Sequence, residues 1–142
     1  MLGQCLCENI IFEIKVATAD LYQCHCSLCR KSTGSASNTA LIVKADDLLW
    51  LGGRENISSF TKTSGFRSDF CSTCGSPVPN PLRNTGYYWI PAGLLESEAD
   101  IQVVAHLHTA SKAAWDTLQK GHQYATMPEI DELIHLLRNS HG

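Results

Sequence analysis

The sequence predicts a mostly β fold of antiparallel sheets with a helix near the C-terminus. Ile10, Phe12, Ile14 and Val16 recur at every second position, which is the period of a strand with one buried face. Near the C-terminus the apolar spacing changes to the three and four residues that mark a helix face. The length of 142 residues predicts one domain over residues 1–142.

The strand segments are short apolar runs bounded by turn residues. Ser64-Gly65 marks a turn between two of them and predicts a hairpin. Three prolines between residues 77 and 81 cannot donate to a sheet ladder, so this stretch is expected at a sheet edge or in a loop. The predicted strands cover residues 9–16, 21–24, 39–43, 48–51, 57–62, 66–71, 87–90 and 101–107.

The C-terminal helix is predicted over about 127–138. Thr126 and Glu129 stand three residues apart, as in a capping box, and the helix is expected to end near Arg138. The residues that form its apolar face are Ile130, Leu133, Ile134 and Leu137. A shorter helical turn is expected over Ser111–Thr117.

Composition and charge exclude several classes of function. The net charge is -3 and no basic block exists, so no nucleic-acid partner is expected. The longest uncharged apolar stretch, about residues 87–95, falls well short of the roughly 20 residues that span a bilayer. The N-terminus lacks the positive and apolar regions of an export signal. We therefore expect a cytoplasmic protein with no membrane partner.

The seven cysteines are the unusual feature of the composition. An odd number in a chain without an export signal indicates metal binding or catalysis rather than a disulfide framework. In a C-x-x-C turn both sulfurs can face one point while nearby amides stabilise the thiolates. The spacing therefore predicts at least one zinc ion. The cysteines form three blocks: Cys5 and Cys7; Cys24, Cys26 and Cys29; and Cys71 and Cys74.

Seven sulfurs divide into four, which close a structural zinc site, and three, which leave one coordination position open. Spacing alone permits two allocations. In one, Cys26, Cys29, Cys71 and Cys74 form a zinc ribbon. In the other, Cys5, Cys7, Cys71 and Cys74 form the closed site. The second allocation is preferred because Cys24, Cys26 and Cys29 can wrap one ion from a single loop.

Three blocks of sequence resemble the glutathione-dependent formaldehyde-activating enzyme family. They read Gly-Gln-Cys-Leu-Cys at 3–7, Cys-His-Cys-Ser-Leu-Cys-Arg-Lys at 24–31 followed by Gly34, and Phe-Cys-Ser-Thr-Cys-Gly at 70–75. Lys112 and Trp115 are similar to the closing Ser-Lys-x-x-Trp segment of the family. The resemblance covers about residues 3–115.

The resemblance implies a β-tent fold with two zinc ions per chain. It implies that Cys5, Cys7, Cys71 and Cys74 hold a structural zinc. Cys24, Cys26 and Cys29 would hold a second, labile and catalytic zinc. The family reaction joins glutathione and formaldehyde as S-hydroxymethylglutathione or splits that adduct, which is carbon–sulfur lyase chemistry.

The implied partners are a small-molecule thiol, with glutathione as cosubstrate, and an aldehyde. The same zinc fold also occurs in centromere protein V, so the alternative function is a zinc-stabilised binding module without turnover. The sequence does not indicate an oligomeric state.

The sequence also predicts the conformation or setting of several residues near the cysteines and of two histidines. Glu8 stands where the family has glycine, so Asn9 is expected to take the left-handed turn instead. Arg30 and Lys31 could offset the negative charge of the second site, or simply be solvated. His25 is expected to point away from the ion and pack. His106 and His108 are expected on one strand face, more often facing solvent than flanking the site.

Overall fold

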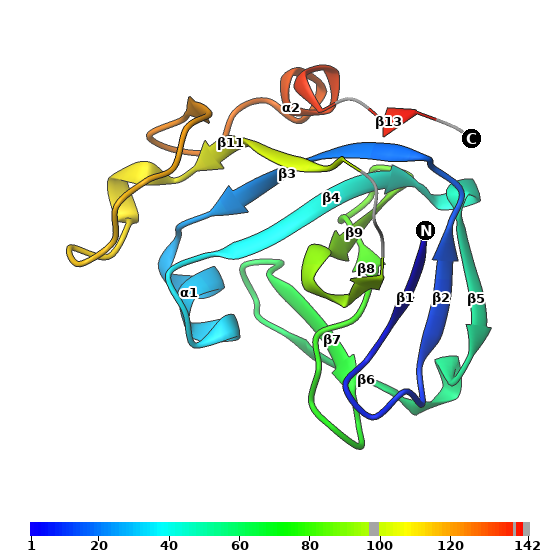
Figure 1. Cartoon of the computed structure of the whole chain (residues 1–142). Coiled ribbons are helices and arrows are strands. Elements are labelled where there is room, and N and C mark those ends of the chain that lie inside the picture. Colours follow the sequence, from blue (N-terminus) through cyan, green and yellow to red (C-terminus); the bar gives the residue numbers. More distant parts are fainter. Residues whose placement is uncertain (97–99, 138, 141–142) are drawn as a thin grey trace.

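The computed structural model describes residues 1–96, 100–137 and 139–140. Strands make up 40% and helices 19%, which confirms the predicted mostly β class with a C-terminal helix. Figure 1 shows the strands arranged as a strongly curved main sheet, a smaller sheet around the N-terminal strands and a separate hairpin.

The smaller sheet is antiparallel and has the order β10-β1-β2-β5. Gly3 in β1 pairs with Phe12 in β2, and a Cβ at Gly3 would lie only 2.3 Å from the Phe12 ring. Glycine therefore lets the N-terminal strand lie directly on that ring. The strands are β1 (Leu2–Gln4), β2 (Ile11–Ile14), β5 (Leu48–Gly52) and β10 (Leu95–Glu96).

The main sheet has the order β12-β11-β3-β4-β9-β8, with β13 also paired to β3. Its pairs β3–β11 and β11–β12 are parallel, so the sheet is mixed where antiparallel pairing was expected. The proline-rich β8 lies at its edge, as the missing N–H groups predicted. The strands are β3 (Thr18–Cys24), β4 (Asn38–Lys44), β8 (Asn80–Pro81), β9 (Tyr87–Pro91), β11 (Gln102–Leu107), β12 (His122–Gln123) and β13 (Asn139–Ser140).

The predicted hairpin is present as β6 (Ile57–Thr61) and β7 (Arg67–Cys71). Gly65 sits in its turn with φ 93°, a backbone conformation that glycine adopts readily. Short 3-10 helices connect other strands. They cover Ala45–Asp47, Arg54–Asn56, Ala92–Leu94 and Thr109–Ser111.

The C-terminal helix α2 (Ile130–Leu136) is shorter than the predicted 127–138. Thr126 does not cap it, because the backbone of this segment pairs with the chain after β11: the Thr126 carbonyl accepts from the His108 N–H. The expected end at Arg138 lies outside the described residues. In the described part of the chain, no helix is long and apolar enough to cross a membrane.

Two further differences from the expected helices are seen. The helical turn expected over Ser111–Thr117 is wrong, because only the 3-10 turn at Thr109–Ser111 forms there. A helix that was not predicted, α1 (Ser27–Thr33), follows β3. None of its residues is buried, so it carries no apolar periodicity that a sequence could reveal.

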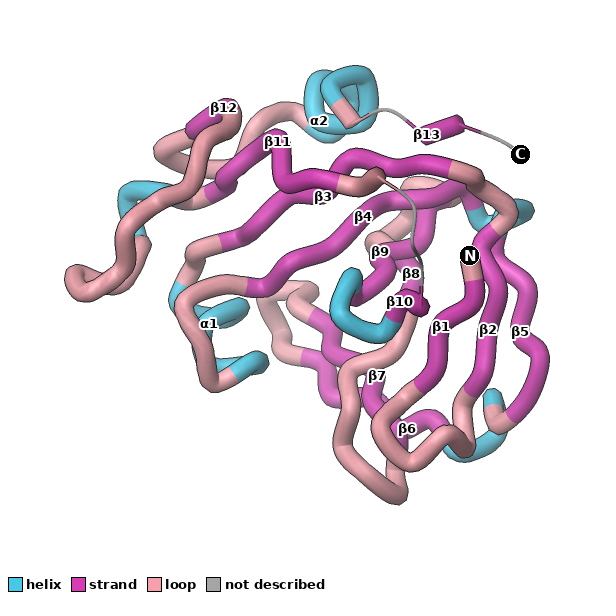
Figure 2. Tube along the Cα trace, in the orientation of Figure 1, coloured by secondary structure: helices cyan, strands magenta, loops and turns pink. Residues whose placement is uncertain are grey.

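Two apolar cores lie on the two faces of the main sheet. One is built by Phe12, Ile14, Leu21, Leu41 and other residues from β2, β3 and β4. The other joins Leu133 and Leu137 to side chains of β3, β4 and β11. Figures 1 and 2 show α2 over strands β3 and β11, with α1 where β3 ends. The cores thus fix the end of β3, from which Cys24, Cys26 and Cys29 extend.

Candidate metal centres

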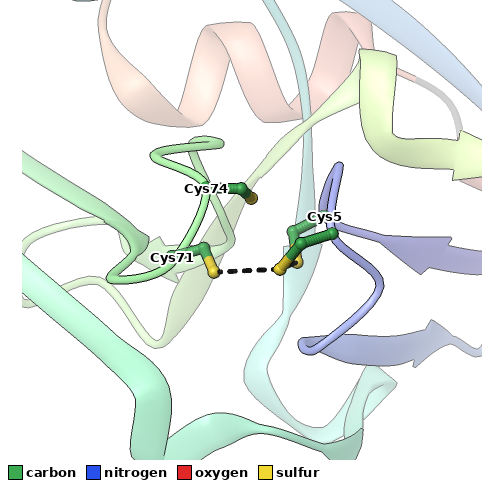
Figure 3. A group of neighbouring side chains, drawn as sticks. Cys5, Cys71 and Cys74 are labelled. Carbon is green, nitrogen blue, oxygen red and sulfur yellow. Dashed lines mark hydrogen bonds between the residues drawn. The ribbon is translucent and has the colours of Figure 1, made fainter.

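Four cysteines from two distant segments meet beside the hairpin. Cys5 and Cys7 belong to the turn after β1, whereas Cys71 ends β7 and Cys74 follows it. Their sulfurs all lie within 4.8 Å of one another. The Cys7 sulfur is 3.6 Å from that of Cys5 and 3.7 Å from that of Cys71. Figure 3 shows Cys5, Cys71 and Cys74 directed toward a common point.

Hydrogen-bond donors surround these sulfurs. The Ile10 N–H donates to the Cys5 sulfur at 3.3 Å, and the Asn56 side-chain amide donates to the Cys71 sulfur at 3.5 Å. Backbone amides of Cys74 and Thr73 hold the pKa of Cys71 below its ordinary value. The hydroxyl and backbone amide of Ser76 lower the pKa of Cys74 to about 5. Within the Cys71–Cys74 turn these contacts favour thiolates, the form of cysteine that binds metal. The pKa of Cys7 is instead raised to about 12, because the backbone N–H of Asn9, which lowers it, is outweighed by burial and by the other three sulfurs.

The spacing of these sulfurs fits zinc. Four sulfurs at about 2.3 Å from one ion in a tetrahedron lie about 3.8 Å apart, close to the 3.6 and 3.7 Å found for the two pairs above. Cys5 and Cys71 are 2% and 0% exposed and share a small apolar core with Ile10 and Val78. We call these residues the four-cysteine group (Cys5, Cys7, Cys71, Cys74). The group therefore has the donors of a closed structural site.

The remaining three cysteines form a second group within one stretch of chain. We call Cys24, Cys26 and Cys29 the three-cysteine group. Cys24 ends β3, Cys26 is the N-cap of α1, and the Cys29 N–H donates to the Cys26 sulfur at 3.3 Å. The three sulfurs lie within 4.8 Å of one another, and all three residues are half-buried. Three convergent thiols fit a zinc ion with one position left open.

Negative charge in the three-cysteine group concentrates on Cys26. Hydrogen bonds from the thiols of Cys24 and Cys29 lower the pKa of Cys26 to about 2. Donation to the Cys26 thiolate in turn raises the pKa of Cys24 to about 11. Contact with Cys24 and Cys26 raises the pKa of Cys29. One thiolate with two thiol donors is the arrangement that this geometry favours before any metal binds.

The structure thus brings the cysteines together as four and three. Within the described residues no group combines Cys26 and Cys29 with Cys71 and Cys74, as the ribbon allocation requires. Zinc occupancy of both groups stays a prediction. Of the neighbouring cations, Lys31 is exposed, whereas the Nε of Arg30 is buried without a hydrogen-bond partner.

The turn of the four-cysteine group contains a non-glycine residue in the left-handed region. Glu8 has φ 65°, so Glu8 itself, rather than Asn9, takes this conformation and the expectation for Asn9 is wrong. The Glu8 N–H donates to the Cys5 carbonyl, and the Cys5 N–H donates to the Ile10 carbonyl. These two bonds fix the tight turn at Glu8 that brings Cys7 to its partners.

Two buried histidines lie near the three-cysteine group: His25 stands between Cys24 and Cys26, and His106 lies on β11, which pairs with β3. His25 is 2% exposed and packs, as expected. His106 is fully buried, so the expectation of a solvent-facing His106 is wrong, and His108 lies beyond the end of β11. The His25 Nε2 is 2.9 Å from the His106 Nδ1, and the His106 Nε2 is 3.4 Å from the Lys120 carbonyl. Burial and the neighbouring His106 lower the pKa of His25.

An aspartate that sequence reasoning missed completes this arrangement. The Asp116 Oδ2 lies 3.3 Å from the His25 Nδ1. Both residues line a cleft of about 330 Å³ between the end of β3, the start of β4 and the segment around Asp116. Asp116 follows Trp115 in the closing segment of the family resemblance, but its contact with a residue 91 positions earlier leaves no trace in local spacing.

Comparisons with known proteins bear on family and fold. The profile of the family described as "Glutathione-dependent formaldehyde-activating enzyme" matches residues 1–111. The fold is similar to the crystal structure of a Rhodobacter sphaeroides protein, with a TM-score of 0.58 and 24% identity over 72% of this chain and 100% of that chain. No curated protein matches this sequence.

Proposed function

Because the chain belongs to the glutathione-dependent formaldehyde-activating enzyme family, we propose that it is a zinc-dependent carbon–sulfur lyase that forms and splits S-hydroxymethylglutathione. The convergence of Cys24, Cys26 and Cys29 within 4.8 Å is the observation that supports this proposal most directly. A zinc ion bound by three thiolates supplies an open position at which a fourth thiol ionises.

The reaction itself needs little covalent work from the chain. The glutathione sulfur adds to the formaldehyde carbonyl carbon, one carbon–sulfur bond forms, and the carbonyl oxygen takes up the proton released by the thiol. The reverse reaction returns that proton to the sulfur. The chain contributes by holding the two reactants together, which removes the entropy cost of their encounter.

The residues of the three-cysteine group have distinct parts in this proposal. Cys24, Cys26 and Cys29 hold the second zinc. The Cys29 N–H, which already donates to the Cys26 sulfur, keeps that sulfur ionised. The positive charge of Arg30, one residue beyond Cys29, offsets part of the negative charge that a fourth thiolate would add.

The four-cysteine group has a structural part in the proposal. A zinc held by Cys5, Cys7, Cys71 and Cys74 has no open position. It would fasten the N-terminal turn to the hairpin, and so stabilise a single domain over residues 1–142. The seven cysteines, all within the described residues, form no disulfide. Free thiols suit a reducing compartment, and a cytoplasmic location is part of the proposal.

Cobalt substitution tests whether glutathione reaches the three-cysteine group. Adding glutathione to the cobalt-loaded chain is expected to intensify the thiolate-to-metal charge-transfer band, because a fourth sulfur joins the metal. Cys26→Ser should abolish this response, whereas Ser27→Ala, an exposed neighbour, should retain it.

Exchange measured at equilibrium tests turnover. The zinc-loaded chain should speed the exchange between glutathione, formaldehyde and their adduct above the spontaneous rate, and Cys26→Ser should not. Unchanged exchange with both zinc ions bound would favour the alternative, a zinc-stabilised binding module.

A further inference from the structure

A second cleft lies between the hairpin and the strands around it. Its volume of about 270 Å³ is just below the range of about 300–1,000 Å³ typical of ligand pockets, so it suits a small ligand. Its lining residues come from β5 to β9 and the turn between β5 and β6, and none of them belongs to a cysteine group. The charged residues among them indicate what the cleft can bind.

This cleft and the three-cysteine group are on opposite faces of the main sheet. Tyr88, which lines the cleft, packs against the core that contains Phe12 and Leu41. Cys24 packs against the other core, which contains Leu133 of α2. A ligand in the cleft would therefore be separated from the three-cysteine group by the sheet, so any role of the cleft is distinct from metal binding there.

A buried carboxylate holds Arg67 in place at one wall of the cleft. The Arg67 Nε and Nη2 donate to the two carboxylate oxygens of Asp69 at 2.8 and 3.0 Å, and the Ser59 hydroxyl donates to Oδ1 of Asp69 at 2.6 Å. The side chain of Asp69 is 5% exposed, whereas that of Arg67 is 42% exposed. The ion pair uses one edge of the guanidinium and leaves the outer fork, formed by Nη1 and Nη2, with two parallel N–H groups. This fork is positioned before any ligand binds.

Arg54 supplies a second guanidinium to the same cleft. Its guanidinium carbon lies 5.7 Å from the centre of the Trp50 ring, which is a cation–π contact. Among the described residues no carboxylate pairs with Arg54, and an arginine has five N–H donors. The contact with Trp50 thus places in the cleft a cation whose donors have no acidic partner.

The charges and donors of the cleft favour an anion. Among the described residues that line it, Asp69 is the one acidic side chain, and Arg67 already neutralises it. Arg54 therefore gives the cleft a net positive charge, which attracts small anions. A carboxylate has two oxygens, both of which the fork of Arg67 would occupy, whereas a phosphoryl group has three terminal oxygens and a charge of up to about -2. A phosphoryl group can therefore bind both arginines at once.

We propose that this cleft binds the phosphoryl group of a small ligand, either inorganic phosphate or a phosphate monoester, through Arg54 and the outer fork of Arg67. Tyr88, whose phenol can donate, borders the same space. Asp69 and Ser59 act by holding Arg67. This binding goes beyond the proposed function, because neither glutathione nor formaldehyde carries a phosphoryl group.

Calorimetric titration of the full-length, zinc-loaded chain with phenyl phosphate tests the site, and benzoate is the matched carboxylate. The second arginine predicts at least about tenfold tighter binding of phenyl phosphate than of benzoate. Inorganic phosphate is the third probe. Tighter binding of phenyl phosphate would assign the site to a monoester, and equal or tighter binding of inorganic phosphate would assign it to the ion itself. Equal binding of phenyl phosphate and benzoate, or no binding of phenyl phosphate, would overturn the proposal.

Arg54→Gln tests the residues, because Arg54 is exposed and its loss leaves no buried charge unpaired. It should weaken the binding of phenyl phosphate by about tenfold. Lys62→Gln makes the same charge change at an exposed position of the hairpin outside the cleft, and should weaken binding by no more than about twofold. Similar losses in the two variants would show that only the overall charge matters, and would overturn the proposal.

Arg67→Gln should weaken binding at least as much as Arg54→Gln. It also leaves the buried carboxylate of Asp69 without its partner, which destabilises a fold, so a melting curve must accompany it. If Arg67→Gln is unfolded, the comparison of Arg54→Gln with Lys62→Gln still decides the matter. A folded Arg67→Gln that binds phenyl phosphate normally would contradict the role of the fork.

The second zinc is a competing site, since a phosphate oxygen could take its open position. Cys26→Ser, which should lack this ion, is expected to bind phenyl phosphate as tightly as the unmodified chain does. Loss of binding in Cys26→Ser would place the phosphoryl group on the zinc and overturn the role of the cleft. The proposed lyase function is tested by the cobalt and exchange measurements, and it stands or fails without this cleft.

Discussion

The two cysteine groups present the same ligand chemistry in opposite structural settings. The four-cysteine group draws its sulfurs from segments 64 residues apart, and two of its members are buried in a small core. The three-cysteine group comes from one stretch between β3 and α1, and all of its members are half-buried. We therefore expect that loss of a cysteine in the four-cysteine group lowers the stability of the fold. Loss of a cysteine in the three-cysteine group should mainly lower metal binding at that group.

Cys71→Ser is the change expected to have the largest effect. Binding of a structural zinc contributes about 10 kcal/mol or more to folding in small zinc domains, which exceeds the lower part of the usual range of total stability, about 5–15 kcal/mol. The variant is therefore expected to be unfolded or insoluble. Far-UV circular dichroism, a melting curve and zinc analysis check this. A variant that has lost zinc but keeps its melting temperature would show that the four-cysteine group does not stabilise the fold, and the proposed difference between the two groups would be wrong.

Cys26→Ser should leave the fold intact and lower the zinc content from two ions to one per chain. Its side chain is half-buried and accepts the capping hydrogen bond of α1 from the Cys29 N–H, so we expect the loss to be confined to the loop and the first turn of α1. Metal analysis and a melting curve on the same sample provide the test. Unfolding of this variant would instead assign a structural role to the three-cysteine group.

His106→Phe is expected to act on the three-cysteine group alone. The change removes the buried hydrogen-bond partner of the His25 Nε2, which costs about 1–3 kcal/mol. His25 lies between Cys24 and Cys26, so the zinc affinity of that group should fall while that of the four-cysteine group stays constant. Urea unfolding and stepwise chelator competition measure the two effects, with the exposed His135→Asn as control. Equal loss of both ions would contradict this.

Glu8→Gly is expected to have the smallest effect, a gain of up to about 1 kcal/mol. Glycine removes the cost of a left-handed conformation at φ 65°, about 1–2 kcal/mol, part of which is lost to the greater freedom of glycine in the unfolded chain. Glu8→Ala keeps the unfavourable conformation and so should show no such gain. Urea titration of both variants would detect the difference, and equal stability would show that the turn at the four-cysteine group is unstrained.

The sequence predicted the parts of this molecule that depend on local pattern. Alternation located β2, and the turn at Ser64-Gly65 located the hairpin of β6 and β7. The prolines placed β8 at an edge. In each case the signal lies within a few residues, because strand period and turn chemistry are local properties.

The missed features depend on contacts across long stretches of chain. His106 is buried because His25, 81 residues away, binds it, and β11 pairs in parallel with the distant β3. Thr126 is drawn from its predicted cap position by a hydrogen bond to His108. Helix α1 gave no signal because it buries no side chain. The grouping of the cysteines could be predicted, but Asp116 and its cleft could not.

The distance in sequence between the two halves of the four-cysteine group has a consequence during synthesis. Cys71 follows Cys7 by 64 residues, which at about 5–20 residues per second takes about 3–13 s. Cys24, Cys26 and Cys29 emerge within about one second of each other at the same rate. Strand β11, which carries His106, is made later than either group. All three cysteines of the three-cysteine group are thus present on the growing chain before strand β11, which pairs with β3, has been made.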